Sequence, residues 1–97
     1  MLLKSAKSGY AMAQVRLGTF YREGVALVDQ DYKKALTWYY EAAKQNYAHG
    51  EYYVGYCYYY GYGVKKDYKK AAYWMRRAAK HGYNYANTFI KRNKLYF

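Results

Sequence analysis

The small and apolar residues between positions 48 and 82 recur at the spacing of two amphipathic helices. Ala71, Ala78 and Ala79 stand at i, i+7 and i+8, which puts them on one face of a helix. Residues 61–64, with the sequence Gly-Tyr-Gly-Val, interrupt this pattern and predict a turn. The pattern therefore predicts a pair of helices packed against each other.

Glycines and one aspartate mark the ends of these two helices. Asp67 suits the N-cap of the second helix, because its carboxylate can accept a hydrogen bond from a free backbone N–H. Gly61 and Gly82 follow the last expected helical residues, where a left-handed cap favours glycine. Gly55 lies inside the first helix, where glycine costs about 1 kcal/mol relative to alanine. We therefore expect a neighbouring helix to approach Gly55 too closely for a side chain.

The same pattern occurs a second time, nearer the start of the chain. Residues 11–24 match residues 48–61 with a constant shift of 37 positions, and residues 31–46 match residues 67–82 with a shift of 36. The difference of one residue falls in the loop after Gly24. Because the match resumes beyond this insertion, we interpret the two segments as copies of one structural repeat.

Several positions define the motif of the two copies. They are Leu17, Gly18, Tyr21, Gly24, Asp31, Lys34, Ala35, Trp38, Ala42 and Ala43 in the first copy, and Gly61, Tyr62, Gly63, Val64, Asp67, Lys70, Ala71, Trp74, Ala78, Ala79 and Gly82 in the second. This motif resembles the Sel-one-like repeat, a relative of the tetratricopeptide repeat. The resemblance implies an all-α fold, a right-handed α-solenoid of about two and a half antiparallel helix pairs. It also implies an adaptor surface for other proteins, without catalysis or a cofactor.

We expect a single repeat domain over residues 1–97. Its expected parts are the end of a preceding helix at 1–9, a first repeat at 10–46, a second at 47–82, and a partial repeat or C-terminal cap at 83–97. Helices are expected at about residues 2–8, 10–23, 31–45, 47–60, 67–81 and 83–94. Lys91 replaces the glycine of the earlier copies, which favours a cap. The chain starts inside a repeat, which fits either a minimal N-terminal cap or a piece of a longer array.

Composition limits the class of protein. The single cysteine excludes an internal disulfide framework, and 97 residues suffice for one small domain. No apolar run reaches the roughly 18 residues of a membrane span. The first nine residues are too short and too rich in lysine for the apolar core of a signal peptide, so we expect a cytoplasmic location.

The exposed positions of the expected concave side form a tyrosine-rich stripe. If the first helix of each pair lines this side, the groove positions fall three, four and seven residues apart. They are Met12, Val15, Arg16, Thr19 and Arg22 in the first repeat, His49, Tyr52, Tyr56 and Tyr59 in the second, and Tyr85, Thr88 and Arg92 in the third. We expect a peptide or partner helix, preferably acidic, to dock here on Tyr52, Tyr56 and Tyr59, because aromatic side chains dominate interface hot spots. Arg22 and Arg92 would set the charge preference. The alternative is that these tyrosines fill a small core that is short of leucine.

Charge gives a second candidate surface. The formal net charge is +11, and residues 61–97 hold ten Lys or Arg against Asp67 alone. The basic residues expected on the convex face of the second repeat are Lys66, Lys69, Lys70, Arg76, Arg77 and Lys80. They could attract acidic protein segments, an anionic membrane or nucleic acid. No recognisable nucleic-acid motif accompanies them, and they could equally be a solvated face that keeps a protein with 18 tyrosines soluble. Self-association through open repeat ends is a third possibility.

The pattern of reactive residues does not indicate an enzyme. His49 and His81 fall on different expected helices, and His81 suits a cation at the C-terminal end of a helix dipole. Cys57 has no histidine at an evident partner position, so we expect a buried thiol. The carboxylates are scattered, with Asp31 and Asp67 serving as caps. We therefore predict no catalytic, cofactor or metal site.

Overall fold

Five α-helices make up the described part of the chain. The computed structural model describes residues 9–25 and 27–97, so the helix expected at residues 2–8 lies outside the described residues. The helices are α2 (Ala11–Glu23), α3 (Tyr32–Ala43), α4 (Ala48–Tyr60), α5 (Tyr68–Lys80) and α6 (Asn84–Asn93), and the described residues contain no strand. The all-α prediction is therefore confirmed.

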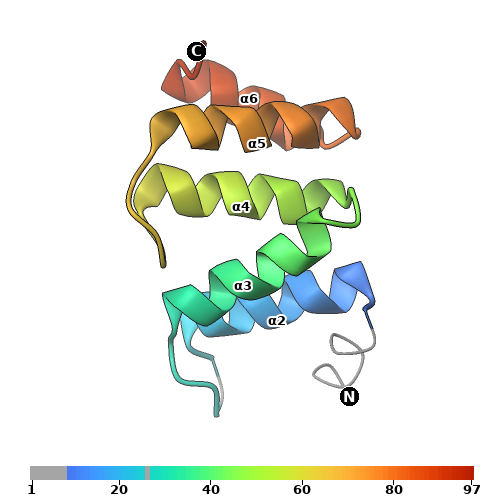
Figure 1. Ribbon diagram of the computed structural model, residues 1–97, viewed down its shortest axis with the longest axis vertical. Helices are drawn as coiled ribbons and strands as arrows, with labels where there is room; N and C mark the ends of the chain where they lie inside the picture. The colour runs from blue at the N-terminus through green and yellow to red at the C-terminus, as the bar shows by residue number, and fades with distance from the viewer. Residues whose placement is uncertain (1–8, 26) are drawn as a thin grey trace.

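The helices stack one after another along the longest axis of the molecule, which measures 38 Å (Figure 1). In Figure 1, α3 and α5 overlie α2 and α6, so that the second helix of each repeat faces the viewer. This is the antiparallel two-layer arrangement that the resemblance implies. The helices α2 and α4, the first of their pairs, also contact each other.

The predicted capping residues occupy the helix ends. The Asp31 carboxylate accepts a hydrogen bond of 3.1 Å from the backbone N–H of Lys34, and Asp67 accepts one of 3.0 Å from Lys70. Gly61 has a φ of 75°, and its N–H donates to the carbonyl oxygen of Cys57 at 2.8 Å. Each observed helix is slightly shorter than its predicted range, because that range included capping residues.

Gly18 and Gly55 mark the closest approach between the two helices of each repeat. A Cβ atom on Gly18 would lie 2.8 Å from Cε1 of Tyr39, and one on Gly55 would lie 3.1 Å from the carbonyl oxygen of Ala71 and 3.2 Å from Cγ of Met75. Tyr39 and Met75 are equivalent positions of the two repeats. The expectation of a tight helix contact at Gly55 is confirmed, and the first repeat contains the same contact.

The two larger clusters of buried side chains hold the helices together, and a smaller one contains Ala13 and Leu17. The first contains Val15, Ala35, Tyr39, Ala42, Ala43, Val54 and Cys57. The second contains Ala72, Met75, Ala78, Ala86, Phe89 and Leu95. Leu95 is 3% exposed, and the Arg76 guanidinium donates to the carbonyl oxygen of Phe97 at 3.0 Å. The residues that follow α6 therefore turn back toward α5 and cover that end of the core, while Lys91 is exposed.

Candidate partner-binding surfaces

A pocket of about 440 Å³ opens between α2 and α4. Its lining residues are Met12, Val15, Arg16, Thr19, Phe20, Tyr47, His49 and Tyr53. Five of these eight are positions that the sequence pattern assigned to the groove, although Val15 is buried in the core and not exposed as expected. Met12 is 57% exposed and Phe20 38% exposed, so apolar surface is accessible at this site.

Phe20, Tyr47 and Tyr53 line this pocket and were missed in the sequence. Phe20 follows Arg16 by four positions, and Tyr53 follows His49 by four positions. Residues four apart share a helix face, so the same spacing rule could have found both. Tyr47 is the residue before α4, where the helical period no longer applies.

Arg22 and Thr19 are held by a buried tyrosine. The Tyr39 hydroxyl lies 2.8 Å from Oγ1 of Thr19 and accepts a hydrogen bond of 3.1 Å from Nε of Arg22. The guanidinium also lies 5.4 Å from the ring centroid of Tyr53 and 5.3 Å from that of Tyr56. Burial raises the pKa of the Tyr39 hydroxyl to about 12, although both hydrogen bonds oppose this effect. Arg22 is therefore engaged within the protein, whereas Arg16 is exposed and forms none of the ion pairs found among the described residues.

Tyr52, Tyr56 and Tyr59 each contact Phe89 of α6. Their ring centroids lie 6.0, 6.2 and 5.1 Å from that of Phe89. The Tyr59 hydroxyl also donates to Oδ1 of Asn93 at 3.0 Å. All three tyrosines are half-buried, and burial raises the pKa of Tyr52 to about 12. The contacts on one side of the tyrosine stripe therefore join α4 to α6.

The remaining predicted groove residues lie outside the pocket. Tyr85, Thr88 and Arg92 are all exposed on α6. His49, which does line the pocket, has its ring centroid 5.4 Å from that of Tyr47 and 4.2 Å from that of Tyr83.

The basic residues of the outer face are exposed, with one exception. Lys66, Lys69, Lys70, Arg76 and Lys80 are exposed, whereas Arg77 is partly buried. Nε of Arg77 donates to Oε2 of Glu51 at 3.1 Å, and its NH2 group donates to Oδ1 of Asn46 at 3.0 Å. The charge of Arg77 is therefore balanced within the fold.

Glu51 is a fully buried carboxylate whose role the sequence pattern did not indicate. Its second oxygen, Oε1, lies 2.6 Å from Nδ1 of His81, so the carboxylate joins α4 to two residues at the end of α5. His81 lies at the C-terminal end of α5 as expected, but the sequence did not indicate its direct contact with Glu51. The equivalent residues of the first repeat are Gln14 and Gln45, joined by a hydrogen bond of 2.9 Å. The sequence did contain one sign of this role, because Glu51 is a carboxylate whereas the equivalent residue of the first copy, Gln14, is an amide.

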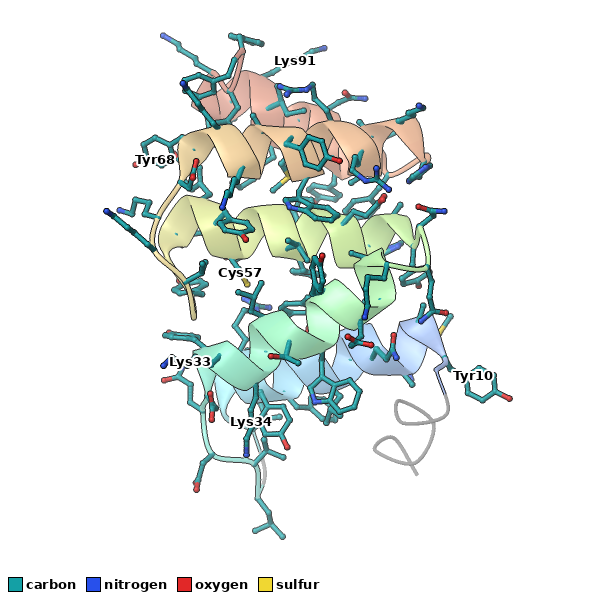
Figure 2. All side chains as sticks on the ribbon, in the orientation of Figure 1. Tyr10, Lys33, Lys34, Cys57, Tyr68 and Lys91 are labelled. Carbon is teal, nitrogen blue, oxygen red and sulfur yellow. The ribbon has the colours of Figure 1, made fainter. Side chains whose placement is uncertain are left out.

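A smaller pocket of about 280 Å³ lies between α3 and α4. Its lining residues are Leu36, Thr37, Tyr40, Glu41, Val54 and Tyr58. The neighbouring Cys57 is fully buried, and Figure 2 shows its sulfur pointing from α4 toward α3. Burial raises the pKa of this thiol to about 12, which suppresses the thiolate that a nucleophile requires.

The described residues show neither a membrane-spanning helix nor a cluster of metal-ligating side chains. No described helix combines the length and the apolar character needed to cross a bilayer. Nowhere in residues 9–25 and 27–97 do three or more His, Cys, Asp or Glu side chains come together as a possible metal site.

Solved structures of helical repeat proteins resemble this chain closely. A Sel1 repeat protein from Oxalobacter formigenes has a TM-score of 0.86 and 37% identity, over 94% of this chain and 26% of that protein. The uropathogenic Escherichia coli antigen c5321, described as displaying an SLR fold, has a TM-score of 0.82 and 39% identity, over 88% and 18%. Helicobacter pylori cysteine rich protein B has a TM-score of 0.84 and 31% identity, over 91% and 65%. The chain thus spans less than two thirds of each of these proteins.

A search of curated proteins finds no match. The comparison with family models, in contrast, agrees with the solved structures. The family model for the Sel1 repeat matches residues 11–47 and 48–83, which together make up most of the chain. Sel1 repeat proteins are in general non-catalytic scaffolds for protein–protein interaction. The chain belongs to the Sel1 repeat family.

Proposed function

We propose that this chain is a non-catalytic interaction module whose inner groove, formed by the pocket between α2 and α4 together with Tyr52, Tyr56 and Tyr59, binds an acidic peptide or partner helix. The observation that carries the proposal is the pocket between α2 and α4, where accessible apolar surface and an exposed cation occur together. Apolar side chains in a concave site supply binding energy, and a few polar groups fix the orientation of the ligand. The general role of the family supports a protein partner.

The chemistry of the pocket defines the bound segment. Met12, Phe20 and Tyr53 suit one aliphatic or aromatic side chain of the partner. Arg16 lies at the same site and suits a carboxylate, and the net charge of +11 favours the approach of acidic segments. The partner is therefore an acidic segment that carries at least one large apolar residue. Tyr52, Tyr56 and Tyr59 provide a second contact region toward α6.

A peptide selection tests this proposal. The protein is presented to a display library of random peptides, and the affinities of the enriched peptides are measured by fluorescence anisotropy. We expect peptides that combine Asp or Glu with an apolar residue. Phe20→Ser and Arg16→Glu should each weaken binding by about tenfold, which corresponds to the loss of one good interface contact.

A charge reversal on the other face is the matched control. Lys33→Glu changes an exposed residue of α3 by the same charge as Arg16→Glu (Figure 2). It should leave peptide affinity nearly unchanged. An equal loss with Lys33→Glu, or unchanged binding by both pocket variants with the fold intact, would rule out the groove as the binding site.

A further inference from the structure

The last third of the chain is rich in cations and contains no acidic residue. Residues 68–97 contain eight Lys or Arg and no Asp or Glu. Among the described residues, the carboxylate that pairs with this segment is the buried Glu51, which binds Arg77. The other seven cations are all exposed. The corresponding part of α3 differs, because Lys44, the repeat equivalent of Lys80, pairs with Glu41 at 2.8 Å.

Part of this charge forms a straight row on α5. Lys69, Tyr73, Arg76 and Lys80 stand at i, i+4, i+7 and i+11, which places them on one side of the helix over about 16 Å. The opposite side of α5 is fixed in the core by Ala71, Ala72, Met75 and Ala78. The row therefore projects from a helix whose opposite side is anchored in the core.

Exposed aromatic rings lie beside these cations. Tyr73 is 49% exposed, and its ring is held edge-on to Trp74 at a centroid distance of 5.4 Å. Tyr96 and Phe97 are 70% and 60% exposed. The hydrogen bond from Arg76 to the Phe97 carbonyl brings the segment that carries both rings next to the row. The Arg77 guanidinium lies 5.9 Å from the centroid of the Tyr73 ring, which is otherwise exposed. Cations and exposed rings thus alternate on one surface, defined here as the outer α5 surface and formed by Lys69, Tyr73, Arg76, Lys80, Tyr96 and Phe97.

We propose that the outer α5 surface binds single-stranded nucleic acid, a function separate from that of the inner groove. The three cations would contact successive phosphates, and the rings would stack on unpaired bases. An anionic membrane fits less well, because the apolar side of α5 is buried and Phe97 is the one residue of the outer α5 surface without a polar group on its side chain. An acidic peptide would satisfy the cations without stacking on the rings. Because stacking accepts every base, we expect little sequence preference.

Binding of the whole chain to labelled oligo(dT) tests the proposal. Fluorescence anisotropy is measured with an oligomer of roughly 15 nucleotides at about 50 to 200 mM salt. Replacing Lys69, Arg76 and Lys80 together by Gln should weaken binding more than tenfold and reduce the slope of log affinity against log salt by about 2. Tyr73→Leu should weaken binding by about fivefold or more and leave the slope unchanged, because it removes stacking and no charge.

A matched triple variant on α3 is the control. Lys33, Lys34 and Lys44, also exposed, are replaced together by Gln, which removes the same charge from the first repeat. This variant should retain most of the affinity for oligo(dT). The proposal is overturned if the control loses as much affinity, or if Tyr73→Leu binds normally. It is also overturned if polyglutamate, or vesicles rich in anionic lipid, bind as tightly as oligo(dT).

Discussion

Nδ1 of His81 lies 2.6 Å from Oε1 of Glu51, and this contact distinguishes the second repeat from the first. The two repeats share their caps and their glycine contacts. At the position of Glu51, however, the first repeat has Gln14, and at the position of His81 it has Gln45. A neutral amide pair and an ionic group thus occupy equivalent sites, so the ionic group is not required by the repeat fold itself.

Glu51→Gln should therefore be tolerated, whereas Arg77→Ala should not. Glutamine is the residue at the equivalent position of the first repeat, but removing Arg77 leaves a buried carboxylate with one partner fewer. Thermal unfolding followed by circular dichroism should show a clearly lower midpoint for Arg77→Ala than for Glu51→Gln. The double variant should be more stable than Arg77→Ala alone. A double variant that is less stable would indicate that Arg77 acts mainly through its contacts with Tyr73 and Trp74.

Gly18→Ala should destabilise the protein more than Gly55→Ala. In both helices alanine gains about 1 kcal/mol of helix propensity. At Gly18 the new Cβ would lie 2.8 Å from the Tyr39 ring, which is stacked on Tyr53 and cannot easily move. At Gly55 the neighbours include the flexible side chain of Met75 at 3.2 Å. Overpacking costs about 1–3 kcal/mol, so urea unfolding should show a net loss for Gly18→Ala and a smaller change for Gly55→Ala. The reverse order would contradict the closer contact at Gly18.

The sequence predicted the features that recur and missed those that occur once. Asp67 and Gly55 were identified because a cap and a close helix contact each require a particular kind of residue. The role of Glu51 could not be predicted from residue type in the same way, because its partners Arg77 and His81 lie 26 and 30 residues away, at the end of another helix. The stripe from Tyr52 to Tyr59 was placed on the correct helix face. Spacing alone could not show that Phe89 would cover one side of it, because that depends on how closely α6 packs.

Raising the pH above about 9 should weaken the fold. Burial raises the pKa of Cys57 from 9.0, and that of Tyr39 from 10.0, to about 12 in the folded state. Both groups are then neutral in the folded protein at a pH where they ionise in the unfolded chain. Their contribution to stability is complete below pH 9 and is lost as the pH rises from 9 toward 12. The free energy of unfolding in urea should fall over this range, and Cys57→Ala should reduce the decline.

The reactivity of the Cys57 thiol provides an independent measurement. Only the thiolate reacts with a disulfide reagent, and a pKa of about 12 instead of 9.0 leaves roughly a thousandfold less thiolate at neutral pH. The native protein should therefore react at least a hundredfold more slowly than the protein in urea. Similar rates in the two conditions would show that the thiol is accessible in the native state.

Phe89→Ala should loosen α6 and leave the pocket between α2 and α4 intact. The Phe89 ring is 9% exposed and contacts Tyr52, Tyr56 and Tyr59, so its removal should cost about 3 kcal/mol. Amide hydrogen exchange should accelerate in α6 much more than in α2, because α6 depends on this contact for its attachment. Tyr85→Ala, which changes a residue that is 66% exposed on the same helix, should have little effect. If peptide binding follows the proposed pocket, it should survive Phe89→Ala. Loss of binding with α2 still protected from exchange would instead locate the site on the tyrosines that Phe89 holds.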